Sequence, residues 1–468
     1  MASDSAGIAG SPQTILSVFA SLVNQGVVRR VGPQGFRMLQ TVREYGRGLL
    51  EDEGELDRCA WAHLAWCVSQ AVEPVFDPLD GYLWGPTGHT GDQADLTVAL
   101  SFALDRGEFD SALRLAVTLS PIWAEQGRYI EARMALDRIW EGLPPSAADI
   151  RAILLGWTAE WAWLQGDYTA TGVLAQASLD ASMELAMPRA IAANRYRLGR
   201  VATLRSPATA APLLLDALES FQALGEPRNT CWCLVGLGHA ALGVGDTAAA
   251  QTWLDEAESH REHVSVDSGA WLSLGLQLGI ARLAMHTGDT TRAKRILTET
   301  LLLSRVEHNS YFESLSLSFL CDVYRREQLF AHAVEAGRQG LQLAQLLGHA
   351  YRERQCLIEL ARVALDAGKL ERAMLLDGAV AGLKAQLDFE VAELALLDAA
   401  IDSAPEQAQR LIALEATGRH LTGSERLAQV MALELELGHV RQRSSVLSNR
   451  EAEVLHLLAQ GATNGEIA

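Results

Sequence analysis

Several features that would assign a function directly are missing from this 468-residue sequence. It contains no G-x-x-x-x-G-K-[ST] phosphate-binding loop, so we expect no nucleotide site and no cofactor. No serine, histidine and aspartate residues stand at hydrolase spacing, which predicts no catalytic residue and no enzyme activity. No apolar stretch is long enough to cross a bilayer, and residues 1–13 lack the basic and apolar regions of a signal peptide. These absences predict a cytoplasmic protein that does not contact membranes.

Positive charge is also scarce in this chain. The chain has 39 Lys and Arg residues and 58 Asp and Glu residues, which gives a net charge of −19. Phosphate would repel the chain as a whole, so any contact with DNA must come from a small local patch.

No metal site is predicted. The six cysteines are scattered without zinc spacing, which indicates buried, reduced thiols. His260 and His263 stand beside Glu256 and Glu258 and could share a helix face, but no third ligand accompanies them. A solvated helix end is the better interpretation of this cluster.

A repeated pattern occupies the middle of the chain. A glycine, a residue that is often bulky two positions later and an alanine five positions later (a threonine in one copy) recur at spacings of 39, 40, 39, 43, 40 and 40 residues. The glycine is suited to ending one helix, and the alanine lets a second helix approach closely. Two copies, at Ser206 and Gln328, are degenerate. The anchors are Gly127, Gly166, Ser206, Gly245, Gly288, Gln328 and Gly368.

This pattern resembles the tetratricopeptide repeat, in which helical hairpins stack into a superhelix. The fold class predicted for the chain is therefore all-α, with a tetratricopeptide-like solenoid over residues 107–435. The period is near 40 instead of 34, so the helices should be longer than in the family.

The concave surface of such a solenoid is expected to bind a peptide, a protein or a small molecule. An arginine near an aromatic ring suits an anionic or aromatic ligand. The alternative for the tryptophans is that they pack between helices as core residues. The candidate groove residues are Trp157, Trp161, Arg195, Tyr196 and Arg200.

Residues 12–56 predict a winged-helix-like segment with a small β-hairpin. A helical stripe of apolar residues precedes two strands, Val27 to Val31 and Phe36 to Leu39, and a glycine- and proline-containing turn joins the strands. Thr41 with Glu44 has the spacing of a capping box, which predicts the start of the next helix.

The ten residues from Phe36 to Tyr45 read FRMLQTVREY. They are similar to the F-R-[ML]-L-[EQ]-T-[VI]-R-[EQ]-[YF] segment that follows the nucleotide-binding module of STAND-type bacterial regulators. Five arginines form a basic cluster here. The cluster could touch DNA, but the resemblance favours a surface that packs against the nucleotide-binding module. These arginines are Arg29, Arg30, Arg37, Arg43 and Arg47.

The last 22 residues, 447–468, resemble the opening half of the LuxR-type helix-turn-helix domain, L-[ST]-x-R-E-x-E-V-L-x-L-x-A-x-G-x-[ST]-N-x-E-I-A. Capping boxes that begin at Ser448 and Thr463 predict two helix starts. The resemblance implies that Arg450, Thr463 and Asn464 contact DNA. It also implies a recognition helix after residue 468, so we expect this chain alone not to bind specific DNA.

In STAND-type regulators the order is ATPase, winged helix, helical array and LuxR-type tail, and this chain matches the last three. The ATP site that the family would imply is not in this sequence. The predicted organisation is a disordered N-terminus (1–11), the winged-helix-like segment (12–56), connecting helices (57–106), the array (107–435), a linker (436–446) and a truncated helix-turn-helix (447–468).

The resemblance therefore implies part of a LuxR-family transcriptional regulator whose array senses a ligand or a partner. Ligand binding would release the array from the upstream module, and self-association and DNA binding by the complete protein would follow. The alternative is a tetratricopeptide-type interaction scaffold without DNA binding of its own.

Overall fold

The computed structural model describes residues 12–31, 35–71, 93–261, 264, 270–384, 401–402 and 404–438. The predicted disordered N-terminus, the helix-turn-helix tail with Arg450, Thr463 and Asn464, and His263 all lie outside these residues. The chain divides into two compact units. The first contains the described residues of 12–71, 93–122 and 135–144, and the second contains 123–134 and those from 145 onward.

The first unit holds a two-stranded antiparallel sheet and short helices. Strand β1 pairs with β2 in the register Val28 to Met38 and Arg30 to Phe36. The elements are α2 (Pro12–Asn24), β1 (Val28–Val31), β2 (Gly35–Met38), α3 (Gln40–Asp52), α4 (Leu56–Gln70) and α5 (Gln93–Arg106). Helices α6 (Phe109–Glu125) and α7 (Tyr129–Gly142) contribute residues to both units.

The predicted order of helix, hairpin and helix is present in this unit. The rings of Phe19 and Phe36 meet edge to face with centroids 4.7 Å apart, so α2 packs on the hairpin. The predicted capping box was wrong. Helix α3 already begins at Gln40, with Leu39 at the N-cap and no side-chain cap, so Thr41 lies inside the first turn.

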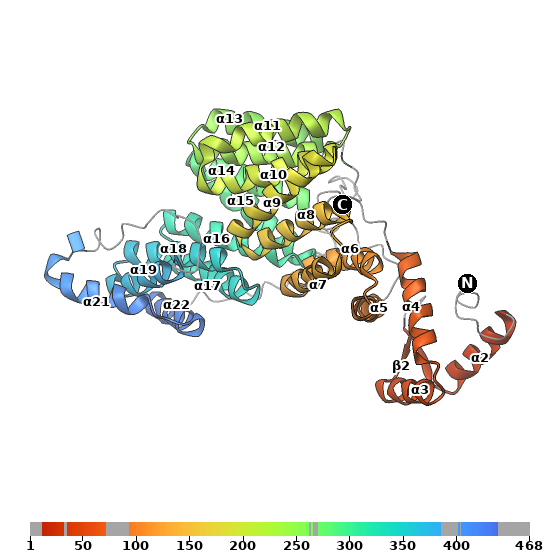
Figure 1. Ribbon diagram of the computed structural model, residues 1–468. Coiled ribbons are helices and arrows are strands. Elements are labelled where there is room, and N and C mark those ends of the chain that lie inside the picture. Colours follow the sequence, from red (N-terminus) through yellow and green to blue (C-terminus); the bar gives the residue numbers. More distant parts are fainter. Residues whose placement is uncertain are drawn as a thin grey trace, which may run out of the picture. The chain divides into compact units, whose positions relative to one another are not determined.

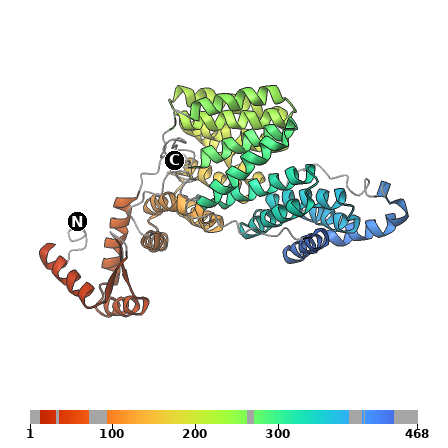
Figure 2. The same ribbon diagram turned by 180° about the vertical axis from the view of Figure 1, so that it is seen from behind.

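The second unit is an array of helical hairpins in which each helix packs against the next, as Figure 1 and Figure 2 show from opposite sides. Its fold is therefore an all-α solenoid. Most of its helices have 15–18 residues, which agrees with the long repeat period. The hairpin helices are α8 (Ala148–Gln165), α9 (Tyr168–Glu184), α10 (Pro188–Arg205), α11 (Pro207–Ala223), α12 (Pro227–Gly243), α13 (Thr247–Arg261), α14 (Ala270–His286), α15 (Thr290–Val306), α16 (Ser310–Arg326), α17 (Phe330–Leu346), α18 (Ala350–Asp366) and α19 (Leu370–Lys384). A short η3 (Pro405–Gln407), α21 (Ala408–Gly418) and α22 (Gly423–Leu437) follow.

The repeat anchors stand at the turns inside the hairpins. Gly166 ends α8 with a φ of 77°, a conformation that costs other residues more, and the side chain of Asp167 then caps α9 by accepting a hydrogen bond from the backbone N–H of Ala170. The other glycine anchors share this left-handed backbone, which confirms that part of the prediction. Of the two anchors without glycine, Gln328 also has the left-handed backbone (φ 59°), whereas Ser206 (φ −151°, ψ 72°) joins α10 directly to α11.

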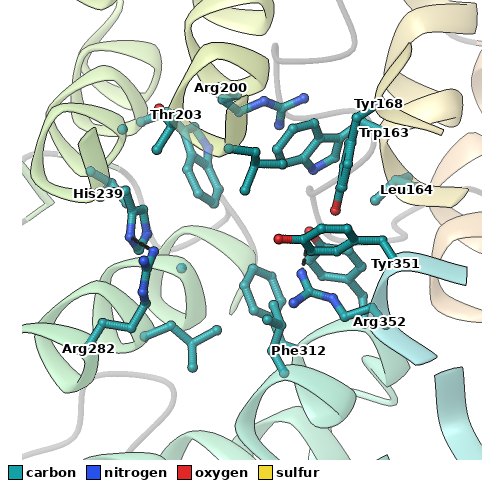
Figure 3. Close-up of a pocket in the computed structure, with 18 of the residues that line it drawn as sticks. Trp163, Leu164, Tyr168, Arg200, Thr203, His239, Arg282, Phe312, Tyr351 and Arg352 are labelled. Atoms are coloured by element: carbon teal, nitrogen blue, oxygen red, sulfur yellow. Dashed lines mark hydrogen bonds between the residues drawn. The ribbon is translucent and has the colours of Figure 1, made fainter. Parts of the chain in front are cut away.

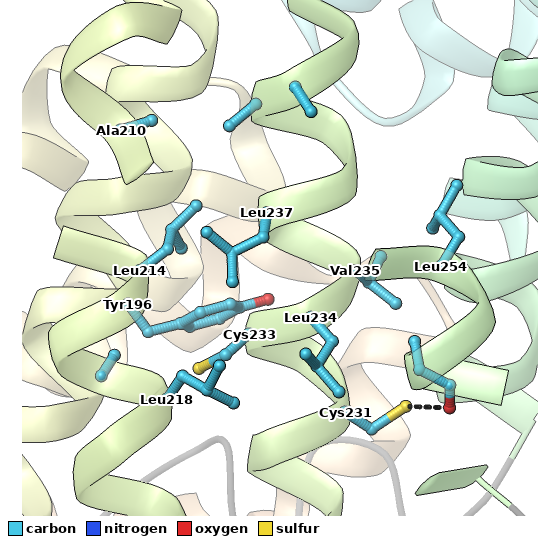
Figure 4. Packing of buried hydrophobic residues seen from close by; sticks show 14 of the residues in the cluster. Tyr196, Ala210, Leu214, Leu218, Cys231, Cys233, Leu234, Val235, Leu237 and Leu254 are labelled. Carbon is cyan, nitrogen blue, oxygen red and sulfur yellow. Dashed lines mark hydrogen bonds between the residues drawn. The ribbon is translucent and has the colours of Figure 1, made fainter. Parts of the chain in front are cut away.

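Small residues set the distance between helices in the core. A Cβ at Gly199 would lie 2.7 Å from Leu214, and a Cβ at Gly238, one repeat later, would lie 2.9 Å from Leu254. Figure 4 shows Leu214 and Leu254 within this apolar cluster. The same position in two successive repeats therefore receives a leucine from the second helix of its own hairpin.

The cysteines of this chain are free thiols, and all but Cys59 are buried. The thiol of Cys231 donates to the carbonyl oxygen of Ala257 over 3.3 Å, as drawn in Figure 4. Burial raises the pKa of Cys231 to about 12. Because the thiolate is the reactive form, this residue is a packing element and not a nucleophile.

Candidate ligand-binding site

A cavity of about 280 Å³ opens on the inner face of the array, within the second unit. Its walls come from the first helices of six consecutive hairpins and from Tyr168 at the start of α9 (Figure 3). The residues recur at helical spacing, so each helix presents one stripe to the cavity. The lining residues are Glu160, Trp163, Leu164, Tyr168, Tyr196, Arg200, Thr203, Leu204, Trp232, Val235, Gly236, His239, Trp271, Gly275, Leu278, Arg282, Tyr311, Phe312, Leu315, Ser318, Phe319, Tyr351, Arg352 and Gln355.

The two ends of this wall meet. The ring of Tyr168 lies 5.0 Å from that of Tyr351, edge to face, and 6.3 Å from the imidazole ring of His349. At the neighbouring turn, a Cβ on Gly166 would clash with His349, so only glycine allows this approach. The superhelix thus brings the first and the sixth of these hairpins together, and the cavity is enclosed on that side.

A buried ion-pair network supports one wall. Glu160 is fully buried, and Arg200 donates to both of its carboxylate oxygens over 2.9 Å. Arg197, only 1% exposed, donates to the same carboxylate over 3.2 Å. Two guanidinium groups of α10 therefore share one carboxylate of α8, and removal of that carboxylate would leave buried positive charge uncompensated.

The guanidinium of Arg200 also contacts two aromatic rings. Its guanidinium carbon lies 4.2 Å from the ring centroid of Trp163 and 5.0 Å from that of Tyr196. Such contacts hold the guanidinium plane against the cavity wall.

Two further arginines line the cavity, and each is hydrogen-bonded to a neutral side chain. Arg282 of α14 lies 2.6 Å from Nδ1 of His239, as the dashed line in Figure 3 marks. Because a guanidinium can only donate, the ring nitrogen accepts and His239 is neutral. Burial, together with the charge of Arg282, holds the pKa of His239 well below its usual value. Arg352 of α18 donates to the hydroxyl of Tyr311 over 3.1 Å and lies 5.0 Å from the centre of that ring.

The apolar part of the wall is aromatic. The chain has 11 Trp, 8 Tyr and 10 Phe residues, and nine of these line this one cavity. The indole of Trp271 stacks on Tyr311 at 5.9 Å and meets Phe312 edge to face at 5.1 Å. This concentration suits a flat or apolar ligand body.

The structure places only part of the predicted groove on this wall. Tyr196 and Arg200 line the cavity. Arg195 does not line it, and its guanidinium lies 3.9 Å from the carboxylate of Asp216.

The groove prediction is corrected for Trp157 and Trp161. Both side chains are fully buried, and neither lines the cavity. Trp161 packs against Trp123 and Tyr129, with ring centroids 6.4 and 6.0 Å apart. Both tryptophans are therefore core residues, in agreement with the alternative prediction from the sequence.

Arg282, Arg352 and most of the aromatic wall were not predicted from the sequence. A usable signal was present in the repeat register. Glu160, Arg200, His239 and Arg282 each stand six residues before the anchor of their own repeat. Because the hairpins are equivalent, one repeat position faces the same inner surface in each of them.

The sequence of this chain is similar to those of proteins named as transcriptional regulators. No protein-family model matches it. Proteins of Mycobacterium bovis and of two Mycobacterium tuberculosis strains, provisionally named HTH-type transcriptional regulators, are 28% identical to it over 316 residues. The match covers 63% of this chain and 33% of each relative, so the chain spans about a third of the length of these curated relatives.

One solved structure with a similar arrangement is the Rap protein complexed with Competence and Sporulation Factor. The match between the two structures covers 74% of this chain and 100% of the Rap chain, with 14% sequence identity and a TM-score of 0.47.

Within the described ranges, no group of three or more His, Cys, Asp or Glu side chains is placed to hold a metal ion. In the same part of the chain, none of the helices combines the length and the apolar character that a membrane crossing needs.

Proposed function

We propose that this chain is the signal-sensing part of a LuxR-family, STAND-type transcriptional regulator. The array binds an effector in its inner cavity, and occupancy of the cavity controls DNA binding by the complete protein. DNA contacts in that protein are proposed for the helix-turn-helix with Arg450, Thr463 and Asn464, as the resemblance of residues 447–468 implies.

The observation that carries the sensing role is the cavity formed by six successive hairpins. Its volume of about 280 Å³ is close to the lower end of small-molecule sites, so it suits one small molecule better than a length of peptide. An effector that touches several hairpins at once stabilises one superhelical pitch over others. A change of pitch is a means to alter contacts elsewhere in a regulator.

The similarity to mycobacterial HTH-type regulators supports the regulatory role. The order of a winged-helix-like segment, an array and a LuxR-like tail supports the STAND assignment. A scaffold that only binds other proteins gains no support from a small cavity lined by charged and aromatic groups.

The test is carried out in the organism that encodes the protein. Leu204→Trp fills the cavity from a wall residue that is 36% exposed, so it should leave the fold intact. Leu224→Trp is the matched control, because Leu224 is 40% exposed and does not line the cavity. We expect Leu204→Trp to change the same transcripts as deletion of the gene, and Leu224→Trp to leave them at the wild-type level.

Two results would refute the proposal in different ways. Unchanged transcripts after gene deletion would remove the regulatory role. Identical transcript profiles for the two tryptophan variants would remove the cavity from signal sensing. Promoter occupancy of the tagged protein, measured by cross-linking, distinguishes direct from indirect regulation.

A further inference from the structure

The charges around the cavity do not balance. Of the described residues that line it, Arg200, Arg282 and Arg352 are cationic and only Glu160 is acidic. Glu160 is already shared between Arg200 and the buried Arg197. The wall therefore carries an excess of positive charge, although the whole chain has a net charge of −19.

Arg282 and Arg352 carry this excess. Within the described part of the chain, neither forms an ion pair with a carboxylate, and their side-chain partners are His239 and the hydroxyl of Tyr311. The Nε of Arg352 is buried without a hydrogen-bond partner. Burial lowers the pKa of Arg282. Both side chains are half-buried. A guanidinium that is partly removed from water without a counter-ion is costly, and an anionic ligand would reduce that cost.

The partners of these arginines also orient them. His239 accepts from Arg282, and Tyr311 accepts from Arg352, so each of these bonds uses one terminal nitrogen and orients the guanidinium at the cavity wall. Trp271 is on α14, the helix that carries Arg282, and its ring stacks on Tyr311 of α16, the residue that accepts from Arg352. A guanidinium beside an aromatic surface favours a flat body that ends in a carboxylate, sulfonate or phosphate.

From this geometry we infer that the cavity selects a small organic acid, in which an aromatic or similarly flat body lies against the aromatic wall and the anionic group binds Arg282 or Arg352. This inference rests on the proposed sensing role of the same cavity and names the chemical class of its effector.

The test uses two fluorescent probes with the same aromatic body and the purified full chain. The anionic probe is 8-anilinonaphthalene-1-sulfonate, and its neutral counterpart is N-phenyl-1-naphthylamine. We expect the anionic probe to bind a saturable site that Leu204→Trp abolishes. Arg282→Gln and Arg352→Gln together should weaken its binding at least about tenfold, because each removes a charged hydrogen bond. Binding of the neutral probe should change less than about twofold.

Arg295→Gln is the control, because Arg295 is an exposed arginine on α15 outside the cavity and pairs with Glu299. The double variant Arg282→Lys and Arg352→Lys keeps both charges, and it should retain binding of the anionic probe if the glutamine variants prove unstable. Circular dichroism and melting temperature identify variants that fail to fold.

Three outcomes would overturn the inference. They are the absence of a saturable site that Leu204→Trp removes, equal loss of both probes in the glutamine variants, and unchanged binding of the anionic probe in those variants. These measurements do not depend on transcription. The acid site can therefore fail while the transcript test succeeds, and the reverse is also true.

Discussion

His349 is a buried histidine at the start of α18, 1% exposed, that both caps its helix and closes the array. Its Nδ1 accepts a hydrogen bond from the backbone N–H of Arg352 over 3.2 Å, and its ring lies 6.2 Å from Tyr311. Burial, with a smaller effect from the charge of Arg352, holds the pKa of His349 well below its usual value. The ring is therefore neutral in the folded protein, while the unfolded chain protonates it near pH 6.5.

The stability of the protein should fall as the pH drops below about 6.5, because the unfolded state then binds a proton at His349 that the folded state does not. His349→Asn removes this titration and keeps the cap, since Asn309 caps α16 in the same way. Between pH 7.5 and pH 5, we expect the wild type to lose up to about 2 kcal/mol more than the variant. Urea unfolding at several pH values measures the difference, and equal losses would contradict the prediction.

At the scale of the helical hairpin, two turns share a backbone conformation but differ in surroundings. Gly166 has a φ of 77° and Gly245 a φ of 80°. A Cβ at Gly245 would meet nothing within 4 Å, whereas a Cβ at Gly166 would clash with His349. Gly245 therefore needs glycine for its backbone conformation alone. Gly166 needs it for the contact between hairpins as well.

Gly245→Ala should destabilise the fold by about 1 kcal/mol through backbone strain. Gly166→Ala should cost about 1 to 3 kcal/mol more, because the added methyl group overpacks the site beside His349. Denaturant unfolding of the two variants gives this comparison. In a His349→Ala background the two costs should become similar. A persistent difference there would assign the extra cost of Gly166→Ala to another cause.

At the scale of the whole array, the contact between Tyr168 and Tyr351 departs from simple nearest-neighbour stacking. In a linear repeat protein each hairpin contacts only the adjacent ones. Here α9 and α18 meet although several hairpins separate them in the sequence, and the cavity lies on the inner side of this closure. Local openings at the two ends of the wall should therefore be coupled.

Tyr351→Ala should increase amide hydrogen exchange in the first turns of α9 by roughly two- to tenfold, since an aromatic pair contributes about 0.5 to 1.5 kcal/mol. Exchange in α13, which lies away from the closure in sequence, should not change. Leu346→Ala is the control, because Leu346 is 80% exposed on α17. Unchanged exchange in α9 would mean that the closure contact does not stabilise the array.

The repeat period, the hairpin turns and the all-α class were readable from the order of residues alone. Helix ends at positions such as Gly166 and Gly288 depend on contacts within a few residues, and a local rule therefore predicts them. A glycine was not decisive at every anchor, because Gln328 also has a left-handed backbone (φ 59°), whereas Ser206 does not (φ −151°). The small hairpin near the N-terminus was predictable for the same reason, because alternating residues and a short turn determine it.

The identity of the cavity wall was decided by packing over the whole array. Trp157 and Arg200 both stood out as candidates, but Trp157 turned into the core and Arg200 toward the ligand space. The repeat register marks one face of the first helix in each hairpin, but whether these faces enclose a cavity depends on the superhelical pitch, to which every hairpin contributes. The meeting of Tyr168 with Tyr351, and the pairing of Arg282 with a neutral histidine, arise only when those hairpins have stacked.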